Sequence, residues 1–166
     1  TPIIDTTQIA TDTSAPLEDK QIQNADITVN PYIPKSLVCN TVETSVPLSM
    51  LYEMNKAMGD MNRKVRGVDW FVCEKLGYSD LIDLCTAFSA EQVDAIAMGI
   101  YQIDQGKALV LGDQTGIGKG RAVSAIMKYA KRIGKKPMFF TEKTNLFSDI
   151  YRDNIAIGLD SAVAIE

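Results

Sequence analysis

A run of glycines that ends in a lysine lies in the second half of the chain, and its residue types are suited to holding phosphate. With its flanks the run reads Gly112-Asp113-Gln114-Thr115-Gly116-Ile117-Gly118-Lys119-Gly120-Arg121. Gly116 and Gly118 allow the backbone to curl so that successive N–H groups point toward one anion. A helix that starts at this point adds a favourable dipole, and Lys119 adds a full positive charge at the outer phosphates. The run therefore predicts a nucleotide-binding phosphate loop.

Two positions depart from the usual form of such a loop. The lysine is followed by Gly120, where a Ser or Thr ordinarily supplies a hydroxyl ligand to magnesium, and the first position is Asp113 instead of glycine. With ATP as the expected ligand and Mg²⁺ as its ion, Thr115 or a water molecule would have to replace that hydroxyl. The alternative interpretation of the run is a plain corner between a strand and a helix.

The elements that must position the loop follow from the hydrophobic pattern around it. Residues 108–111 form a short apolar run typical of a strand, and an amphipathic helix is predicted after the loop, ending at Gly134. Before the strand, Ser89 and Gln92 fit a capping box that starts a helix to about Ile103. Further predicted elements are a strand at 138–141, a helix at about 146–157 and a strand at 162–165. This alternation predicts an α/β domain with a parallel sheet flanked by helices over residues 89–166.

The preceding chain divides into two parts of different character. Residues 1–48 are polar and proline-containing, and we expect an extended N-terminal arm that lies on a surface. Residues 49–88 read as a small helical layer, in which apolar side chains recur at three- and four-residue steps. Within this layer Asp69 and Ser79 are expected to cap two short helices.

The composition excludes several chemistries. The chain of 166 residues has no histidine, so it has no histidine-based triad or general base, and most zinc sites are ruled out. Cys39, Cys73 and Cys85 include no CxxC pair, and each is interpreted as a small buried residue in a reducing, intracellular setting. The net charge of -4 argues against a large basic face. No apolar run approaches the roughly 20 residues that a membrane span needs, so no membrane partner is expected.

The phosphate loop, with Lys-Gly-Arg in place of Lys-Thr, resembles the strawberry notch family of superfamily 2 helicase-like proteins and related phage and plasmid proteins that accompany DNA methylases. Residues 42–45, 88–96 and 135–153 resemble other stretches of that family in order and spacing. The resemblance implies the N-terminal half of a RecA-like lobe. It also implies ATP binding within a nucleic-acid-dependent ATPase.

The resemblance also implies roles for individual residues. Lys119 would hold the β and γ phosphates as the catalytic residue, and Gln92 would contact the adenine edge. The residues implied to bind nucleotide are Gln92, Thr115, Gly116, Ile117, Gly118, Lys119, Gly120 and Arg121. Thr141, Lys143 and Asn145 would touch a nucleic-acid backbone, of DNA rather than RNA. Two plainer interpretations stand beside these: Gln92 serves only the Ser89 cap, and Asn145 is only a helix cap.

The resemblance ends before the parts that hydrolysis needs. The chain shows no acidic magnesium motif after the loop and no second lobe with an arginine finger. The remainder of the motor or another protein chain is therefore an expected partner, in the cytoplasm of a bacterium or phage-infected cell. An alternative is a processed, catalytically inactive phage virion polypeptide, suggested by the non-Met start and the Ala164-Ile165-Glu166 end. A small-molecule kinase is disfavoured by the upstream glutamine.

Overall fold

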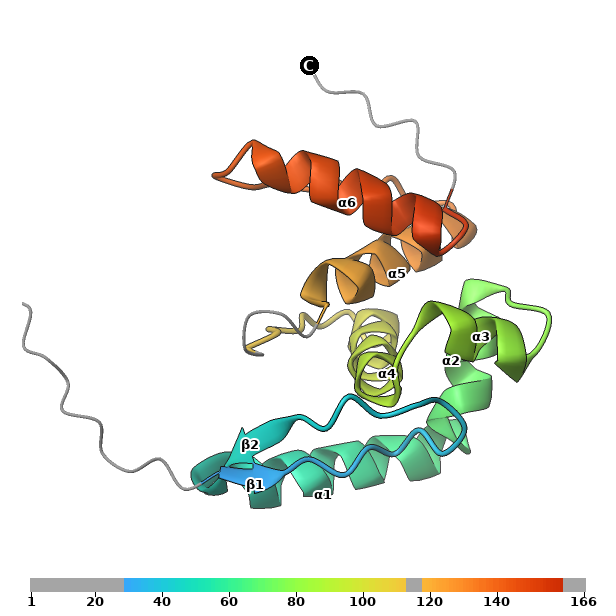
Figure 1. The fold of residues 1–166 in the computed structure, drawn as a ribbon. Helices are drawn as coiled ribbons and strands as arrows, with labels where there is room; N and C mark the ends of the chain where they lie inside the picture. Colours follow the sequence, from blue (N-terminus) through green and yellow to red (C-terminus); the bar gives the residue numbers. More distant parts are fainter. Residues whose placement is uncertain (1–28, 113–117, 160–166) are drawn as a thin grey trace, which may run out of the picture.

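The computed structural model describes residues 29–112 and 118–159, and the chain there is built mainly of helices (Figure 1). In chain order its elements are β1 (Val29–Pro31), β2 (Ser45–Pro47), α1 (Leu48–Val65), α2 (Val68–Leu76), α3 (Leu81–Ala87), α4 (Ala90–Asp104), α5 (Lys119–Arg132) and α6 (Asn145–Ala156). The predicted helices are confirmed, with small shifts at their ends. Within the described ranges, none of these helices has both the length and the apolar character that a bilayer span requires.

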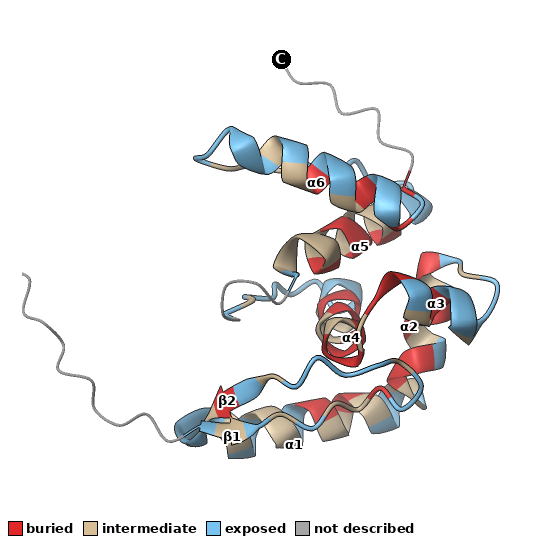
Figure 2. Ribbon diagram, in the orientation of Figure 1, coloured by how far each residue is buried: buried red, intermediate tan, exposed pale blue. Residues whose placement is uncertain are grey.

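Helix α4 is the centre of the core, in contact with α1, α2 and α5. Its capping box is confirmed, because the Ser89 side chain accepts from the Gln92 backbone while the Gln92 side chain accepts from the Ser89 backbone. Val93, Ile96 and Ile100 recur on one face of the helix and are fully buried. Figure 2 shows the buried residues concentrated on α4 and on the sides of its neighbours that face it. Each such aliphatic side chain contributes about 1.5–3 kcal/mol on burial.

Two helices begin at other residues than the sequence predicted. Helix α2 starts after Gly67, so Asp69 lies inside the helix and is not its cap. Helix α3 is capped by Asp80, whose side chain accepts from the backbone N–H of Asp83, and not by Ser79. The N-cap residues are instead Gly67 for α2 and Asp80 for α3. The Asp69 carboxylate is therefore free to bond the segment that precedes the helices.

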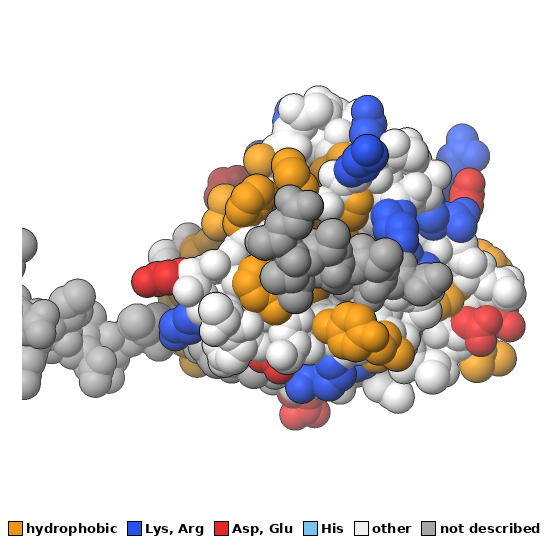
Figure 3. Space-filling view, turned by 90° about the horizontal axis from the view of Figure 1, so that it is seen from above, with side chains coloured by type: hydrophobic (Ala, Val, Ile, Leu, Met, Phe, Trp, Pro, Cys, Tyr) orange, Lys and Arg blue, Asp and Glu red, His pale blue; other side chains and the backbone are white. Residues whose placement is uncertain are grey.

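The predicted strands at 108–111 and 138–141 are not strands in the structure, and the third at 162–165 lies outside the described residues. The sheet of the described chain consists of β1 and β2, which pair antiparallel. A strand needs a ladder partner, and the structure supplies none to these two apolar segments. Their side chains are correspondingly open to solvent at Val110 (90% exposed), Met138 (77%) and Phe140 (82%). Figure 3 shows hydrophobic side chains at the surface in several places on the face seen from above.

The segment between β1 and β2, residues 32–44, is called the strap here, and it is tied to the helices by carboxylates. Asp94 of α4, only 1% exposed, accepts from the Tyr32 hydroxyl at 2.6 Å and from the backbone N–H groups of Lys35 and Ser36 at 2.7 and 2.9 Å. Asp69 accepts from the Ser36 hydroxyl at 2.5 Å. Burial raises the pKa of Asp94, and the three donors partly oppose that rise. The strap is therefore held by buried charge, not by apolar contact alone.

Glu91 makes the second attachment of the strap to α4. Its carboxylate accepts from the Thr41 hydroxyl and, at 3.0 and 3.1 Å, from the backbone N–H of Val42. Burial alone would raise the pKa of Glu91, but these hydrogen bonds, with others from its own backbone and from Ser89, lower it below the ordinary value of 4.5. The charged form of Glu91 is therefore favoured in the folded state.

Glu91→Gln is expected to lower the free energy of unfolding at pH 7 by about 1–2 kcal/mol, because the strap loses hydrogen bonds to a charged acceptor. A carboxyl whose pKa is depressed by folding stabilises above its unfolded pKa, and that contribution is lost as the pH falls through the folded value. The difference between parent and variant should therefore shrink as the pH falls below 4.5. Urea unfolding across this pH range measures it. Glu53→Gln, at an exposed position of α1, is the matched control, and an equal pH dependence in both variants would contradict the prediction.

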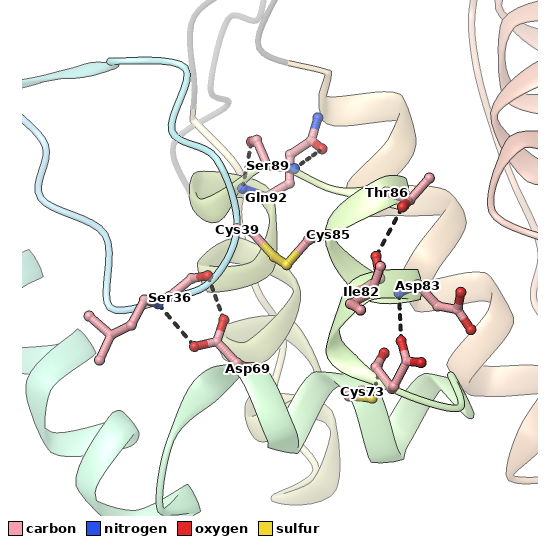
Figure 4. Close-up of a disulfide and its surroundings, with 12 residues drawn as sticks. Ser36, Cys39, Asp69, Cys73, Ile82, Asp83, Cys85, Thr86, Ser89 and Gln92 are labelled. Carbon is pink, nitrogen blue, oxygen red and sulfur yellow. Dashed lines mark hydrogen bonds between the residues drawn. A yellow bond between two sulfur atoms is a disulfide. The ribbon is translucent and has the colours of Figure 1, made fainter.

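The interpretation of all three cysteines as isolated buried residues is wrong for two of them, and the expectation of a reducing setting that depended on it falls as well. Cys39 of the strap and Cys85 of α3 form a disulfide across a sequence separation of 46 residues (Figure 4). The spacing of the two cysteines does not predict this pair, because α1 and α2 separate the strap from α3 in sequence. Cys73 is a free, buried thiol as expected, and it contacts the carbonyl oxygens of Tyr78 and Asp80 at 3.5 and 3.4 Å.

Candidate nucleotide-binding site

The end of the predicted phosphate loop lies at the N-terminus of α5. Gly118 has φ of 78° and ψ of 37°, a left-handed conformation that glycine adopts without strain, and Lys119 is the first helical residue. The first turn of α5 holds no acidic residue, and its N-cap residue, Gly118, makes no side-chain cap. Those N–H groups and the positive end of the helix dipole are suited to an anion. Thr115, Gly116 and Ile117 lie outside the described residues.

Gln92 of α4 reaches the same loop. Its side-chain oxygen accepts from the Ser89 N–H at 3.1 Å, and its amide nitrogen donates to the carbonyl oxygen of Gly118 at 3.4 Å. A Cβ atom at position 118 would collide with that amide nitrogen, so the contact requires a glycine there. The capping interpretation of Gln92 is confirmed, and the structure adds a bond to the phosphate loop. Contact of Gln92 with adenine stays a prediction.

Lys119 and Arg121 extend from the first turn of α5 and are both half-buried. The guanidinium of Arg121 donates to the carbonyl oxygen of Ala87 at 3.2 Å, which links the start of α5 to the end of α3. Lys119 is positioned by the turn that Gly118 permits. The phosphate contacts predicted for these two cations remain predictions, but both residues are placed at the helix terminus that such contacts need.

Asp153 of α6 also belongs to this site, and the sequence reasoning gave it no role. Its carboxylate lies against Gly120, the residue that stands where Ser or Thr is usual. A Cβ atom at position 120 would collide with Oδ2 of Asp153 and would lie 3.7 Å from its Cγ. The sequence feature that could have indicated such a contact is Gly120 itself, because a glycine has no side chain and leaves room there for a group from another helix.

The residues predicted to touch nucleic acid lie together at the turn before α6. The Thr141 hydroxyl accepts from the N–H of Lys143 at 3.1 Å and donates to the carbonyl oxygen of Lys143 at 3.3 Å. Lys143 and Asn145 are exposed. Asn145 is the first residue of α6, and the N-cap position is Thr144, whose side chain makes no capping hydrogen bond. The interpretation of Asn145 as a helix cap is therefore wrong. The turn leads directly into α6, and α6 packs on α5, the helix that follows the phosphate loop.

The described residues contain no cluster of three or more His, Cys, Asp or Glu side chains that is arranged to hold a metal. A magnesium ion at this site would accordingly depend on oxygens from a bound nucleotide, which is how Mg²⁺ is commonly held. Lys131, Lys135 and Lys136, which follow the loop in sequence, are exposed. The donor set at the start of α5 thus fits a phosphate group, and it fits a metal only together with that phosphate.

A family model described as P-loop containing NTP hydrolase pore-1 matches residues 15–166. Comparisons with curated proteins and with solved structures found no match. The matched range includes the phosphate-loop run, Gln92 and both helices that form the site.

Proposed function

Since this chain belongs to the family described as P-loop containing NTP hydrolase pore-1, we propose that it binds ATP as the first part of a helicase-like motor of superfamily 2. The family makes the domain a nucleotide-binding P-loop NTPase domain. The finer assignment to a strawberry notch-like motor depends on the resemblance of the loop and its flanks. In that assignment ATP hydrolysis needs the acidic motif and the second lobe that follow in such motors.

The contact between Gln92 and Gly118 is the observation that carries this proposal. A glutamine at the third position of α4 is bonded to the phosphate loop, although 26 residues separate the two in sequence. A plain corner between a strand and a helix has no need of such a link. In the proposed site Gln92 would contact the adenine and the residues after Gly118 would contact the phosphates, so this hydrogen bond would link the two ends of the bound nucleotide.

The exposed apolar segments support the proposal that this lobe is completed by other strands. Val110, Met138 and Phe140 are at least 77% exposed, and they lie in the two segments whose sequence predicts strands. An unpaired apolar edge is a template for another strand. The remainder of the motor or another chain is the partner that would pair with them, and together they would form the parallel sheet of a RecA-like lobe.

Nucleic acid is the second ligand in this proposal. Lys143 and Asn145 are exposed at one turn, where a cation and an amide are available to a phosphate backbone. The chain would meet DNA in a bacterium, in a phage-infected cell or in a virion.

Calorimetric titration of the folded chain with ATP, followed by fluorescence anisotropy with a labelled single-stranded DNA, tests the proposal. Saturable ATP binding is expected, together with salt-sensitive DNA binding that Lys143→Ala weakens. RNA of the same sequence should bind more weakly than DNA. A folded chain, verified by circular dichroism, that binds no ATP would contradict the nucleotide assignment, and ATP binding with no DNA binding would contradict the nucleic-acid part alone.

A further inference from the structure

The space beside Gly120 is the starting point of a further inference, which depends on the proposed binding of ATP. Position 120 follows the phosphate-loop lysine, and the residue there ordinarily presents a hydroxyl to magnesium. In this chain that space is filled from another helix, because Oδ2 of Asp153 lies where the side chain of residue 120 would begin. The Asp153 carboxylate therefore lies where the side chain of a Ser or Thr at position 120 would be.

Asp153 is held in this position by the packing of α6 on α5. Its neighbour Ile150 is 6% exposed and lies 3.9 Å from the Cβ position of Gly120, while Asn154 is fully buried. Gly120 and Ser124 are four residues apart and so lie on the same face of α5, where their small size lets α6 approach closely. The packing of α6 on α5 thus brings the Asp153 carboxylate, which is half-buried, against Gly120.

The same interface contains polar atoms that lack partners. Within the described ranges, Oγ of Ser124 and both polar side-chain atoms of Asn154 are buried and have no hydrogen bond. Buried polar groups are nearly always paired with protein or with ordered water. Asn154 follows Asp153 directly, and Ser124 lies one turn after Gly120 on α5.

The charge on Asp153 needs a cation once a nucleotide is bound. In the described chain no hydrogen bond or ion pair to its carboxylate is present, and the adjacent Arg152 is paired with Asp149 at 3.2 Å. A bare carboxylate beside the phosphates would repel them, since like charges at short range are unfavourable. Mg²⁺ removes this repulsion, because it is commonly held by one or two carboxylates together with substrate phosphates.

We propose that Asp153 replaces the missing hydroxyl of the phosphate loop and binds the magnesium ion of Mg·ATP, directly or through a water molecule. Gly120 is then a requirement of the site and not a loss, because any side chain there would displace the carboxylate. The ion enters with the nucleotide, in agreement with the lack of a protein-only metal cluster among the described residues.

The test compares ATP affinity with Mg²⁺ and with EDTA, by calorimetry, for the full chain and four variants. In the parent, Mg²⁺ should raise the affinity for ATP. Asp153→Ala should lose about tenfold to a hundredfold of that gain, the range seen when residues that support a metal are removed. Binding in EDTA should be unchanged or tighter, because a repelling charge is gone. Asp149→Ala removes a carboxylate of the same helix that lies one turn before Asp153 and is paired with Arg152, and it should keep the gain.

Two further variants guard against a merely structural role of Asp153. Asp153→Asn keeps the size of the side chain and one acceptor oxygen, so its fold should persist by circular dichroism while the magnesium-dependent gain falls. The double variant Gly120→Ser/Asp153→Ala restores the usual hydroxyl and frees the space for it, and it should recover part of the gain.

Each remaining outcome counts against a specific claim. If folded Asp153→Asn keeps the full gain, or if Mg²⁺ never raises the affinity of the parent for ATP, the role of Asp153 in metal binding is overturned. If the parent binds no ATP with or without Mg²⁺, the proposed function itself falls, and the metal site falls with it.

Discussion

Lys119→Ala is expected to weaken ATP binding by tenfold to a hundredfold. The residue begins α5 directly after Gly118, so its ammonium is attached at the helix terminus where the phosphates are expected. A hydrogen bond to a charged group contributes about 1.5–3 kcal/mol, and each 1.4 kcal/mol is a factor of about ten in Kd. Titration calorimetry with ATP measures the change directly.

Two control variants separate the role of Lys119 from that of charge in general. Lys136→Ala removes an exposed cation elsewhere on the surface and should leave the Kd for ATP unchanged. Lys119→Arg keeps the charge but replaces a compact ammonium by a planar fork, so we expect it to bind ATP more weakly than the parent. If Lys119→Ala and Lys136→Ala weaken binding equally, the assignment of Lys119 to the phosphates fails.

Ile96→Ala should destabilise the fold more than any surface change, lowering the free energy of unfolding by about 2–5 kcal/mol. Ile96 is fully buried on α4, the helix that contacts α1, α2 and α5. Removing three carbon atoms there leaves a cavity that close-packed neighbours cannot fill. Urea unfolding, followed by circular dichroism, gives the difference from the parent.

The same substitution at Ile155, which is 58% exposed on α6, is the matched control. It should change the free energy of unfolding by less than about 0.5 kcal/mol. Equal destabilisation by the two variants would mean that α4 is not the centre of the core.

What the sequence predicted well were features encoded over a few residues. The capping box of Ser89 and Gln92 joins residues three apart, and the helix that follows has the apolar spacing of α4. The phosphate loop belongs to the same class, because Gly118 and Lys119 specify a turn and a charge by their own chemistry. The family match supports the nucleotide-binding class that this local pattern indicated.

Features that depend on distant partners were not predicted. Asp94 and Ser36 are 58 residues apart, and an acidic residue within an apolar helix does not say which backbone N–H groups will reach it. The segments 108–111 and 138–141 were expected to be strands from their apolar residues, but a strand also needs a neighbour, which the described chain does not supply. The sequence pattern indicates the tendency of a segment to form a strand, whereas strand pairing depends on which other segments the fold brings beside it.

The candidate site divides in the same way. The start of α5 and the capping role of Gln92 were predicted, whereas the contact of Gln92 with adenine stays a prediction. Asp153 was missed because it lies 33 positions after Gly120 and approaches it only through the packing of α6 on α5. The helix that follows Thr144 was predicted at nearly its observed bounds, but Asn145 does not cap it, and the nucleic-acid contact of this turn stays a prediction.

The disulfide between Cys39 and Cys85 makes the intervening chain a closed covalent ring that contains α1 and α2. A single protease cut inside this ring does not divide the molecule, because the two pieces remain linked through the sulfur atoms. Under non-reducing electrophoresis such a nicked chain keeps the mass of the intact one, and only a reductant separates its fragments. The strap and the helix that carries Gln92 would therefore stay joined after an internal cleavage.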